Sequence, residues 1–315
     1  MNIAWVFPGQ GSQAVGMGHD LYEQLPAARA IFDQADEVLG FSLARLCFQG
    51  PEAELTATEN AQPALLTVST ALVRALEDLG GLDLVRPQAV AGHSLGEYSA
   101  LVAGGALDFA TALRLVRRRG ELMASAHEGS MAAVIGLAQP DLEQICQRVT
   151  TARESLGTVV VANYNAPDQL VISGSAAAVQ QAGQQAKEHG AKRVLPLKVS
   201  AAFHSPLMHA AAEGMAHEFA HAEVRDLVVP LIANVTGEAL TTADAVRQEA
   251  VAQVMAPVRW IASVQAMVAR GCTTFVEIGP GKVLTGLIRR IAPQARLVTI
   301  SSLADVQAFI AESRQ

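Results

Sequence analysis

Short apolar runs alternate with amphipathic stretches of helical periodicity along most of the chain. Five runs have the length of buried strands, and they lie at residues 3–7, 88–91, 229–233, 274–278 and 297–300. Helical patterns separate them, for example at residues 63–79 and 206–222. Strands that alternate with helices in this way predict a mainly parallel sheet with helices on both faces, so we expect an α/β fold.

The middle of the chain has a different order of elements. Its pattern predicts a strand at 131–137, a helix at 141–149, strands at 158–162 and 169–173, a helix at 176–189 and a strand at 193–199. The order β-α-β-β-α-β is that of a ferredoxin-like fold. We therefore expect a ferredoxin-like subdomain at residues 127–198, inserted into a discontinuous larger domain built from residues 1–126 and 199–315.

Composition narrows the class of protein. A chain of 315 residues suggests about two domains, or one large α/β domain with an insertion, and 50% of the residues are hydrophobic. The net charge of −7 argues against nucleic acid as a main partner. Three widely spaced cysteines predict neither a disulfide framework nor a zinc site, which fits a reducing cytosol. The chain opens on a strand pattern instead of a signal sequence, and no apolar run reaches membrane-spanning length, so we expect a soluble cytoplasmic protein.

A serine framed by glycines carries the strongest chemical signal. Gly92-His93-Ser94-Leu95-Gly96 lies between an apolar strand run and a helical pattern. A serine with a glycine two positions away on each side, at a strand-to-helix turn, is typical of a nucleophile elbow. The new helix directs its free N–H groups and positive dipole end toward charge that forms near Ser94. The alternative is a serine that only caps the helix after a tight turn.

The candidate base for Ser94 is His204. Ser205 and Pro206 follow it and are a good N-cap and first helical residue, so we expect His204 on a structured loop at the start of a helix. Such loops commonly hold catalytic side chains, although a lone histidine before a helix is more often structural.

Arg119 is expected inside a helix at 109–124, on its apolar side. At about 100° per residue it falls between Leu115 and Met123, whereas Arg118 lies opposite. A buried guanidinium needs an anion, because an unpaired buried charge is very costly. Two partners stay open: an internal Asp or Glu, or a substrate carboxylate held by a bidentate clamp.

The turn after the first strand resembles part of a dinucleotide-binding motif. Gly9 and Gly11 match its opening, but Ala14 stands at the position of the third glycine. We therefore expect no nicotinamide cofactor. A glycine-rich turn at the end of a strand can still supply a backbone N–H to an oxyanion hole.

Two further motifs resemble metal and phosphate sites. Residues 217–221 match the H-E-x-x-H pattern of zinc proteases, but both histidines fall opposite the apolar face of their helix. Residues 279–282 resemble a phosphate-binding loop, with Val283 where Ser or Thr is required. We therefore expect neither kind of site.

Seven motifs along nearly the whole chain resemble those of the malonyl-CoA:acyl-carrier-protein transacylase family, the acyltransferases of bacterial fatty-acid synthesis. They are, in order, FPGQGSQ from Phe7, GHSLGEYSALVAGG from Gly92, RRRGELM from Arg117, ANYNAPDQLVISG from Ala162, AFHSPLM from Ala202, PVRW from Pro257 and EIGPGKVLTGL from Glu277. The resemblance implies a hydrolase-like α/β core that carries the ferredoxin-like subdomain.

The resemblance also implies roles for individual residues. Ser94 takes the malonyl group from coenzyme A and gives it to the phosphopantetheine thiol of acyl carrier protein. His204 is the general base and acid, oriented by the backbone carbonyl of Gln253. Arg119 binds the malonyl carboxylate.

Weaker implications concern the rest of the pocket and the partners. The backbone N–H groups of Gln10 and Leu95 form the oxyanion hole, and Asn163 is a further pocket candidate. Malonyl-CoA is the substrate and acyl carrier protein the partner, with no resident cofactor or metal. We expect no nucleic-acid or membrane partner, and we expect a monomer.

Some positions depart from the family's common pattern. Arg259 stands where a glutamine is frequent and Ala256 where an asparagine is frequent, which puts the local pocket rim in doubt. Ala202-Phe203 before the histidine is similar to malonyl-selecting polyketide acyltransferases, where the ring limits space for an α-methyl group. One methyl group is worth about 1–3 kcal/mol in such discrimination.

Three other functions stay open. A trans-acting polyketide malonyltransferase differs only in the carrier proteins that it accepts. A serine hydrolase of acyl thioesters has no need of Arg119, and its histidine usually comes late in the chain, whereas the last histidine here is His221 of 315 residues. A non-catalytic binding module has no need of Ser94, His204 and Arg119 together.

Overall fold

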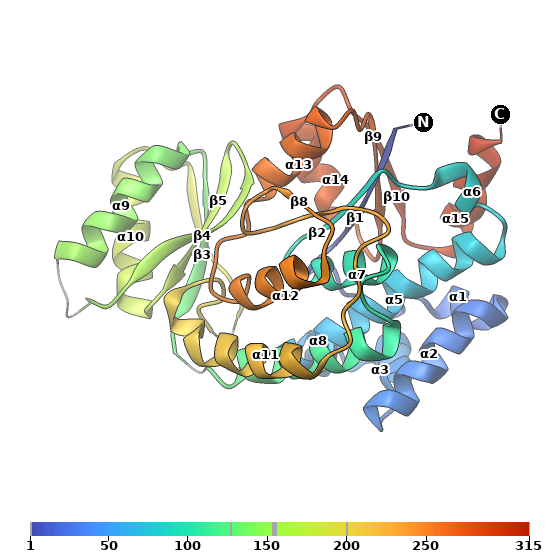
Figure 1. Cartoon of the computed structure of the whole chain (residues 1–315). Helices are drawn as coiled ribbons and strands as arrows, with labels where there is room; N and C mark the ends of the chain where they lie inside the picture. Colours follow the sequence, from blue (N-terminus) through green and yellow to red (C-terminus); the bar gives the residue numbers. More distant parts are fainter. Residues whose placement is uncertain (1, 127, 153–155, 200, 315) are drawn as a thin grey trace.

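Two sheets organise the computed structural model, which describes residues 2–126, 128–152, 156–199 and 201–314. Figure 1 shows the larger sheet with helices on both faces and the smaller sheet at one end of the molecule. The smaller sheet carries α9 (Gln139–Ala152) and α10 (Ala176–Glu188). The predicted α/β fold class is confirmed.

The larger sheet has the strand order β10-β9-β1-β2-β7-β8. Its strands are β1 (Ile3–Phe7), β2 (Ala89–Gly92), β7 (Leu231–Ile232), β8 (Ala239–Leu240), β9 (Thr274–Ile278) and β10 (Arg296–Ile300). Five strands run parallel, and β8 is antiparallel to β7. All residues of β1 and β9 are buried, as central strands covered on both faces require.

Helices cover both faces of this sheet. They are α1 (His19–Gln24), α2 (Pro26–Leu39), α3 (Leu43–Gln49), α4 (Glu52–Thr56), α5 (Thr58–Asp78), α6 (Leu82–Val85), α7 (Gly96–Ala103), α8 (Phe109–Ala124), α11 (His209–His221), α12 (Ala243–Ala252), α13 (Trp260–Ala269), α14 (Val283–Ile291) and α15 (Leu303–Ser313). Alternate residues of β1 pack on opposite sides: Trp5 lies in the core with α5, α7 and α8, and Val6 in the core with α13 and α14.

The smaller sheet has the order β4-β5-β3-β6, with every pair antiparallel. Its strands are β3 (Ser130–Ile135), β4 (Val159–Ala166), β5 (Gln169–Gly174) and β6 (Arg193–Pro196). This is the strand order of a ferredoxin-like fold, and all four strands come from the predicted insertion. One face packs on α9 and α10, and the other faces the larger domain. The predicted boundary at His127 lies outside the described residues.

Two predicted strands are shorter by three residues in the structure, and a proline lies at the limit of each. The apolar run 229–233 becomes the two-residue β7, which starts directly after Pro230, and the pairing strand β8 was not predicted. The run 193–199 becomes β6, which ends at Pro196. Proline has no N–H to donate to a ladder, so strands start or stop beside it.

Three predicted helices also have different starts. The helix predicted at 141–149 is α9, which begins at Gln139 and ends at Ala152. The predicted helix 63–79 is α5, which begins at Thr58 and contains Pro63. The predicted helix 206–222 divides into a 3₁₀ turn at Pro206–Met208 and α11. In the described part of the chain, no helix has both the length and the apolar character that crossing a bilayer requires.

Candidate active site

Ser94 lies on a sharp turn between β2 and α7. Its φ of 52° is left-handed, a conformation that non-glycine residues rarely adopt. A Cβ on Gly92 would collide with the backbone of Gly96, and a Cβ on Gly96 would collide with the carbonyl of Phe7. Both glycines are therefore required by close approach of the backbone, which is the geometry of a nucleophile elbow.

Asn234, in the loop after β7, braces this turn. The backbone N–H of Ser94 donates to Asn234 Oδ1 at 2.8 Å. Asn234 Nδ2 donates to the carbonyl of Gly92 at 2.7 Å. The side chain is fully buried, so these hydrogen bonds hold the strained turn in place without competition from water.

His204 lies beside the hydroxyl of Ser94. Its Nδ1 is 2.9 Å from the carbonyl oxygen of Gln253 and 3.1 Å from that of Ala256. Carbonyl oxygens only accept, so Nδ1 carries the proton and Nε2 is free to accept from Ser94 Oγ at 2.8 Å. This is the tautomer that a general base for Ser94 needs.

The environment of His204 keeps its imidazole neutral. Burial and, next, the positive charge of Arg119 lower the pKa of His204 to about 3. His204 also has a left-handed φ, 56°; among the described residues, Ser94 and His204 are the non-glycine residues with positive φ. Backbone strain at these two positions coincides with the chemistry.

Arg119 projects from α8 into the same site and is fully buried. Its Nη1 donates to Gln62 Oε1 at 2.9 Å. Its Nη2 donates to Gln253 Oε1 at 2.9 Å and to Ser94 Oγ at 3.1 Å. These acceptors are neutral, so among the residues that the structure describes no internal acid pairs directly with the guanidinium, and that alternative is not supported. Burial lowers the pKa of Arg119 from its usual value, yet an arginine stays charged in proteins.

A cavity of about 360 Å³ opens between the two sheets above these residues. The predicted residues that line it are Gln10, Ser94, Leu95, Arg119, Asn163 and His204. Gln253 lies behind them, fully buried, and reaches the site through its hydrogen bonds. Apolar side chains form much of the wall, among them Met123, Met131, Val171, Phe203 and Leu284.

Gln10 and Leu95 bring their backbones to the cavity from two different turns. Gln10 follows β1, and its side chain donates to Thr58 Oγ1 at 3.2 Å. Leu95 is the N-cap residue of α7. Within the described residues, no hydrogen-bond acceptor is found for either backbone N–H. Two free N–H groups beside a nucleophile have the composition of an oxyanion hole.

The sequence matches a known family over almost its whole length. The acyl transferase domain family matches residues 4–304. The chain belongs to this family. It is 46% identical over 311 residues to the malonyl CoA-acyl carrier protein transacylase of Bacillus subtilis (strain 168), which covers 98% of this chain and 96% of the relative. The protein of the same name from Escherichia coli (strain K12) is 44% identical, with 98% of each chain covered.

Solved structures agree with these relatives. An acyl-carrier-protein-S-malonyltransferase from Bartonella henselae superposes with a TM-score of 0.95 at 43% identity, over 100% of both chains. A malonyl-transacylase solved in complex with its type II PKS acyl-carrier protein superposes with a TM-score of 0.94 at 40% identity, over 99% of this chain and 100% of that one. The hydrolase-like core with a ferredoxin-like subdomain is thus the fold of this acyl transferase.

Four residues at the site were not found from the sequence. Gln62 on α5 accepts a hydrogen bond from Arg119, and Asn234 after β7 accepts one from the backbone of the turn at Ser94. Glu97 and Glu249 are both buried near Gln253. One signal was available: Glu97 is an acidic residue in an otherwise mostly apolar helix. The other three were silent, because they reach the site from separate elements.

Positions that depart from the family pattern have defined places. Ala256 contributes its backbone carbonyl to His204, a contact that does not depend on the side chain. The guanidinium carbon of Arg259 lies 5.5 Å from the ring centre of Tyr164, so this cation stacks on an aromatic ring. Arg259 is thus held at β4, outside the residues that line the cavity of Ser94.

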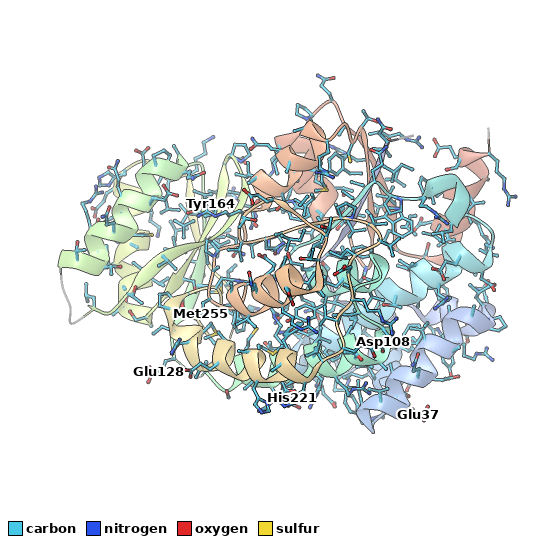
Figure 2. The ribbon with its side chains drawn as sticks, in the orientation of Figure 1. Glu37, Asp108, Glu128, Tyr164, His221 and Met255 are labelled. Atoms are coloured by element: carbon cyan, nitrogen blue, oxygen red, sulfur yellow. The ribbon has the colours of Figure 1, made fainter. Side chains whose placement is uncertain are left out.

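The histidines of the H-E-x-x-H motif are not among the residues that line this cavity. His217 and His221 are exposed on α11, and Figure 2 shows His221 at the outer surface of that helix. His221 Nδ1 is 2.9 Å from the carbonyl of His217, an ordinary i,i+4 contact. In the described ranges, no group of three His, Cys, Asp or Glu side chains is arranged to hold a metal ion.

Proposed function

We propose that this acyl transferase moves a malonyl group from malonyl-CoA to the phosphopantetheine thiol of holo acyl carrier protein, through a malonyl ester on Ser94. The observation that carries the proposal is the place of Arg119. Its buried guanidinium has a nitrogen 3.1 Å from the Ser94 hydroxyl, and its acceptors among the described residues are neutral. A charge in that position favours an acyl group that brings its own carboxylate.

The first half of the reaction acylates Ser94. His204 Nε2 removes the hydroxyl proton while Oγ attacks the thioester carbonyl. The negative charge that forms on the carbonyl oxygen is stabilised by the N–H groups of Gln10 and Leu95. When the tetrahedral intermediate collapses, the carbon–sulfur bond breaks and His204 returns the proton to the departing thiol of coenzyme A.

The second half runs the same steps with a new nucleophile. The phosphopantetheine thiol loses its proton to His204 and attacks the ester carbonyl at the same position. The intermediate expels Ser94 Oγ, which takes the proton back from His204. Throughout, Arg119 holds the malonyl carboxylate, so the reacting carbonyl stays beside the two N–H groups.

The proposal extends to the setting of the protein. The chemistry needs no resident cofactor or metal, because the substrate thioester supplies the activated acyl group. We place the protein in the cytoplasm as a monomer that acts in fatty-acid synthesis. Phe203 lines the cavity next to His204 and limits the room for an α-methyl group, which favours malonyl over methylmalonyl by about 10- to 200-fold.

Intact mass spectrometry tests the function directly. The purified protein is mixed with malonyl-CoA, and holo acyl carrier protein is added afterwards. We expect a malonyl adduct on the protein, its disappearance when the carrier is added, and malonyl-carrier protein as product. The Ser94→Ala variant should form no adduct. Release of free malonate without any malonyl-carrier protein would overturn the proposal in favour of a hydrolase, and carriers from fatty-acid and polyketide systems tested side by side separate those two settings.

A further inference from the structure

Gln253 joins the two halves of the site. Its side-chain Oε1 accepts from Arg119 Nη2 at 2.9 Å, and its backbone oxygen accepts from His204 Nδ1 at 2.9 Å. Its Nε2 donates to the carbonyl of Ser94 at 3.0 Å. An amide has one accepting end and one donating end, so these bonds form together in only one of its two orientations.

The wrong orientation would be costly. A guanidinium only donates, so a rotated Gln253 would bring its own N–H₂ group against Arg119 Nη2. Its oxygen would then face the carbonyl oxygen of Ser94. Two donors opposed at one end and two acceptors opposed at the other would leave buried polar groups unsatisfied. The orientation of the Arg119 guanidinium therefore depends on the group that fixes the side-chain amide of Gln253.

Glu97 holds that amide. It lies in the first turn of α7, is 1% exposed and does not line the cavity. One carboxyl oxygen accepts from Gln253 Nε2, and the other accepts from the backbone N–H of Asn234 at 2.8 Å. With two accepting oxygens it presents an acceptor to each donor, which a carboxamide in the same place cannot do.

Glu249 offers a matched comparison within the same buried pair. Its carboxyl accepts from the backbone N–H of Val235 at 2.8 Å, one residue beyond the N–H that Glu97 binds. Burial and the nearby Glu249 raise the pKa of Glu97, and burial also raises that of Glu249. The two acids thus share their surroundings, but only the Glu97 side chain has a hydrogen bond to the Gln253 amide.

We propose that Glu97 is a positioning residue for malonyl transfer, which fixes the orientation of the Gln253 amide and thereby the aim of the Arg119 guanidinium at the acyl group. This inference rests on the proposed function and names a residue that acts on the same site without touching substrate. Glu97 thus acts on the active site through Gln253, whereas Glu249 has a structural role only.

The test compares Glu97→Gln with Glu249→Gln in two assays. Malonyl transfer from malonyl-CoA depends on Arg119. Labelling of Ser94 by an uncharged fluorophosphonate depends on Ser94 and His204 but has no carboxylate for Arg119 to bind. In Glu97→Gln we expect malonyl transfer to fall about 10- to 100-fold, with a raised KM, because the acceptor that fixes the buried Gln253 amide is lost and a polar group beside Arg119 is left unsatisfied. Fluorophosphonate labelling should fall by no more than about threefold, because backbone carbonyls hold His204 in place.

The outcomes separate the possibilities. Glu249→Gln should change both assays less than about threefold, since its neighbour retains the amide of Gln253. Equal losses in the two assays for Glu97→Gln, or equal losses for the two variants, would overturn the proposal and assign Glu97 a structural role only. If Glu97→Gln does not fold, Glu97→Asp keeps an acidic group but withdraws it from Gln253 Nε2, and it should give the same split between the two assays. A wild-type protein that reacts with fluorophosphonate but not with malonyl-CoA would instead refute the proposed function.

Discussion

Arg117 and Arg119 lie two residues apart on α8, on different sides of the helix, and they differ in burial and in the charge of their hydrogen-bond acceptors. Arg117 Nε donates to Glu121 at 2.8 Å, and its Nη1 donates to Asn60 Oδ1 at 2.7 Å. Its guanidinium carbon lies 5.4 Å from the ring centre of Phe41. Arg119 also has an aromatic neighbour, with its guanidinium carbon 5.7 Å from the ring centre of Tyr98. Its hydrogen-bond acceptors, in contrast, are two neutral amides and a hydroxyl, and its Nε has no acceptor among the described residues.

The comparison separates a structural arginine from one that is ready to bind. The charge of Arg117 is compensated by an acid on its own helix, so nothing further is needed to balance it. The groups that contact the charge of Arg119 directly are neutral, and the buried acid Glu97 lies one hydrogen bond further away, behind Gln253. The guanidinium itself therefore remains attractive to an anion. Burial of such a charge lowers the folding stability of the protein, and functional sites commonly retain such groups because binding needs them.

The largest expected difference between the two arginines is in the acyl-transfer rates of the variants Arg119→Ala and Arg117→Ala. On the proposed function, loss of Arg119 removes the charge-assisted hydrogen bonds that hold the malonyl carboxylate, so malonyl transfer should fall by about 10²- to 10³-fold. Acetyl transfer lacks that carboxylate and should change by less than about tenfold. Steady-state rates with malonyl-CoA and acetyl-CoA measure both. Arg117→Ala should keep both rates within about threefold, and equal losses of malonyl and acetyl transfer in Arg119→Ala would count against the clamp.

The close packing of α8 against α5 positions Arg119, and a substitution at Gly120 tests it. Gly120 lets α8 approach α5 closely, because an added Cβ would lie 2.7 Å from the Cα of Glu59. Backbone atoms cannot move aside cheaply, so Gly120→Ala should lower the free energy of unfolding by about 1–3 kcal/mol. Urea denaturation followed by circular dichroism measures it.

The matched control for that substitution is Gly286→Ala on α14. Apart from the backbone of its own helix, an added Cβ there meets no described atom within 4 Å, so the variant should gain up to about 1 kcal/mol from helix propensity. If Gly120→Ala is stabilised as much as Gly286→Ala, the close approach of α5 and α8 does not constrain the site.

The third prediction concerns pH. In the wild type the pKa of His204 is lowered to about 3, first by burial and then by the positive charge of Arg119, and His93 adds to the lowering. Protonation of His204 removes the base, so fluorophosphonate labelling of Ser94 should stay constant from about pH 8 to about pH 5. Arg119→Ala removes the nearby charge and admits water, and both effects raise the pKa of His204. The acid limb of the labelling rate should then move up by at least about one pH unit.

The control for the pH profile again uses the other arginine. Arg117 is not among the charges that shift His204, so Arg117→Ala should reproduce the wild-type profile. Circular dichroism at each pH excludes unfolding as the cause of lost labelling. Coincident acid limbs in Arg119→Ala and wild type would show that the charge of Arg119 has no influence on the base.

Much of this contrast was predictable, because its ingredients are local in the sequence. The glycines at 92 and 96 predict the turn that holds Ser94, and helical periodicity places Arg119 on the apolar side of α8. The β-α-β-β-α-β order likewise comes from consecutive patterns. The placement of His204 beside Ser94 could be proposed from residue type, although the contact itself joins positions 110 residues apart.

The remaining features depend on tertiary contacts that no local pattern specifies. Gln62 and Gln253 are uncharged, so nothing in the sequence marks them as partners of Arg119. Asn234 follows an apolar run that was expected to form a longer strand, but the strand is short beside Pro230 and the asparagine turns back to the elbow. Burial of Glu97 and Glu249 side by side opposes the usual preference of acids for solvent, so it cannot be anticipated from composition.

The smallest expected effect concerns the contribution of Arg117 to the free energy of unfolding, compared with that of Arg118. Arg117 is 29% exposed and has four partners, whereas Arg118 is 47% exposed, 3.5 Å from Glu121 and 3.4 Å from Glu218. Arg117→Ala should therefore lower the free energy of unfolding by about 1 kcal/mol, and Arg118→Ala by less than about 0.5 kcal/mol. Urea denaturation at low and high salt measures both, and salt should shrink the Arg118 effect more because that cation relies on exposed ion pairs. A loss for Arg117→Ala no larger than for Arg118→Ala would mean that its hydrogen bonds to α5 add nothing, and that α8 is fixed against α5 by its apolar side alone.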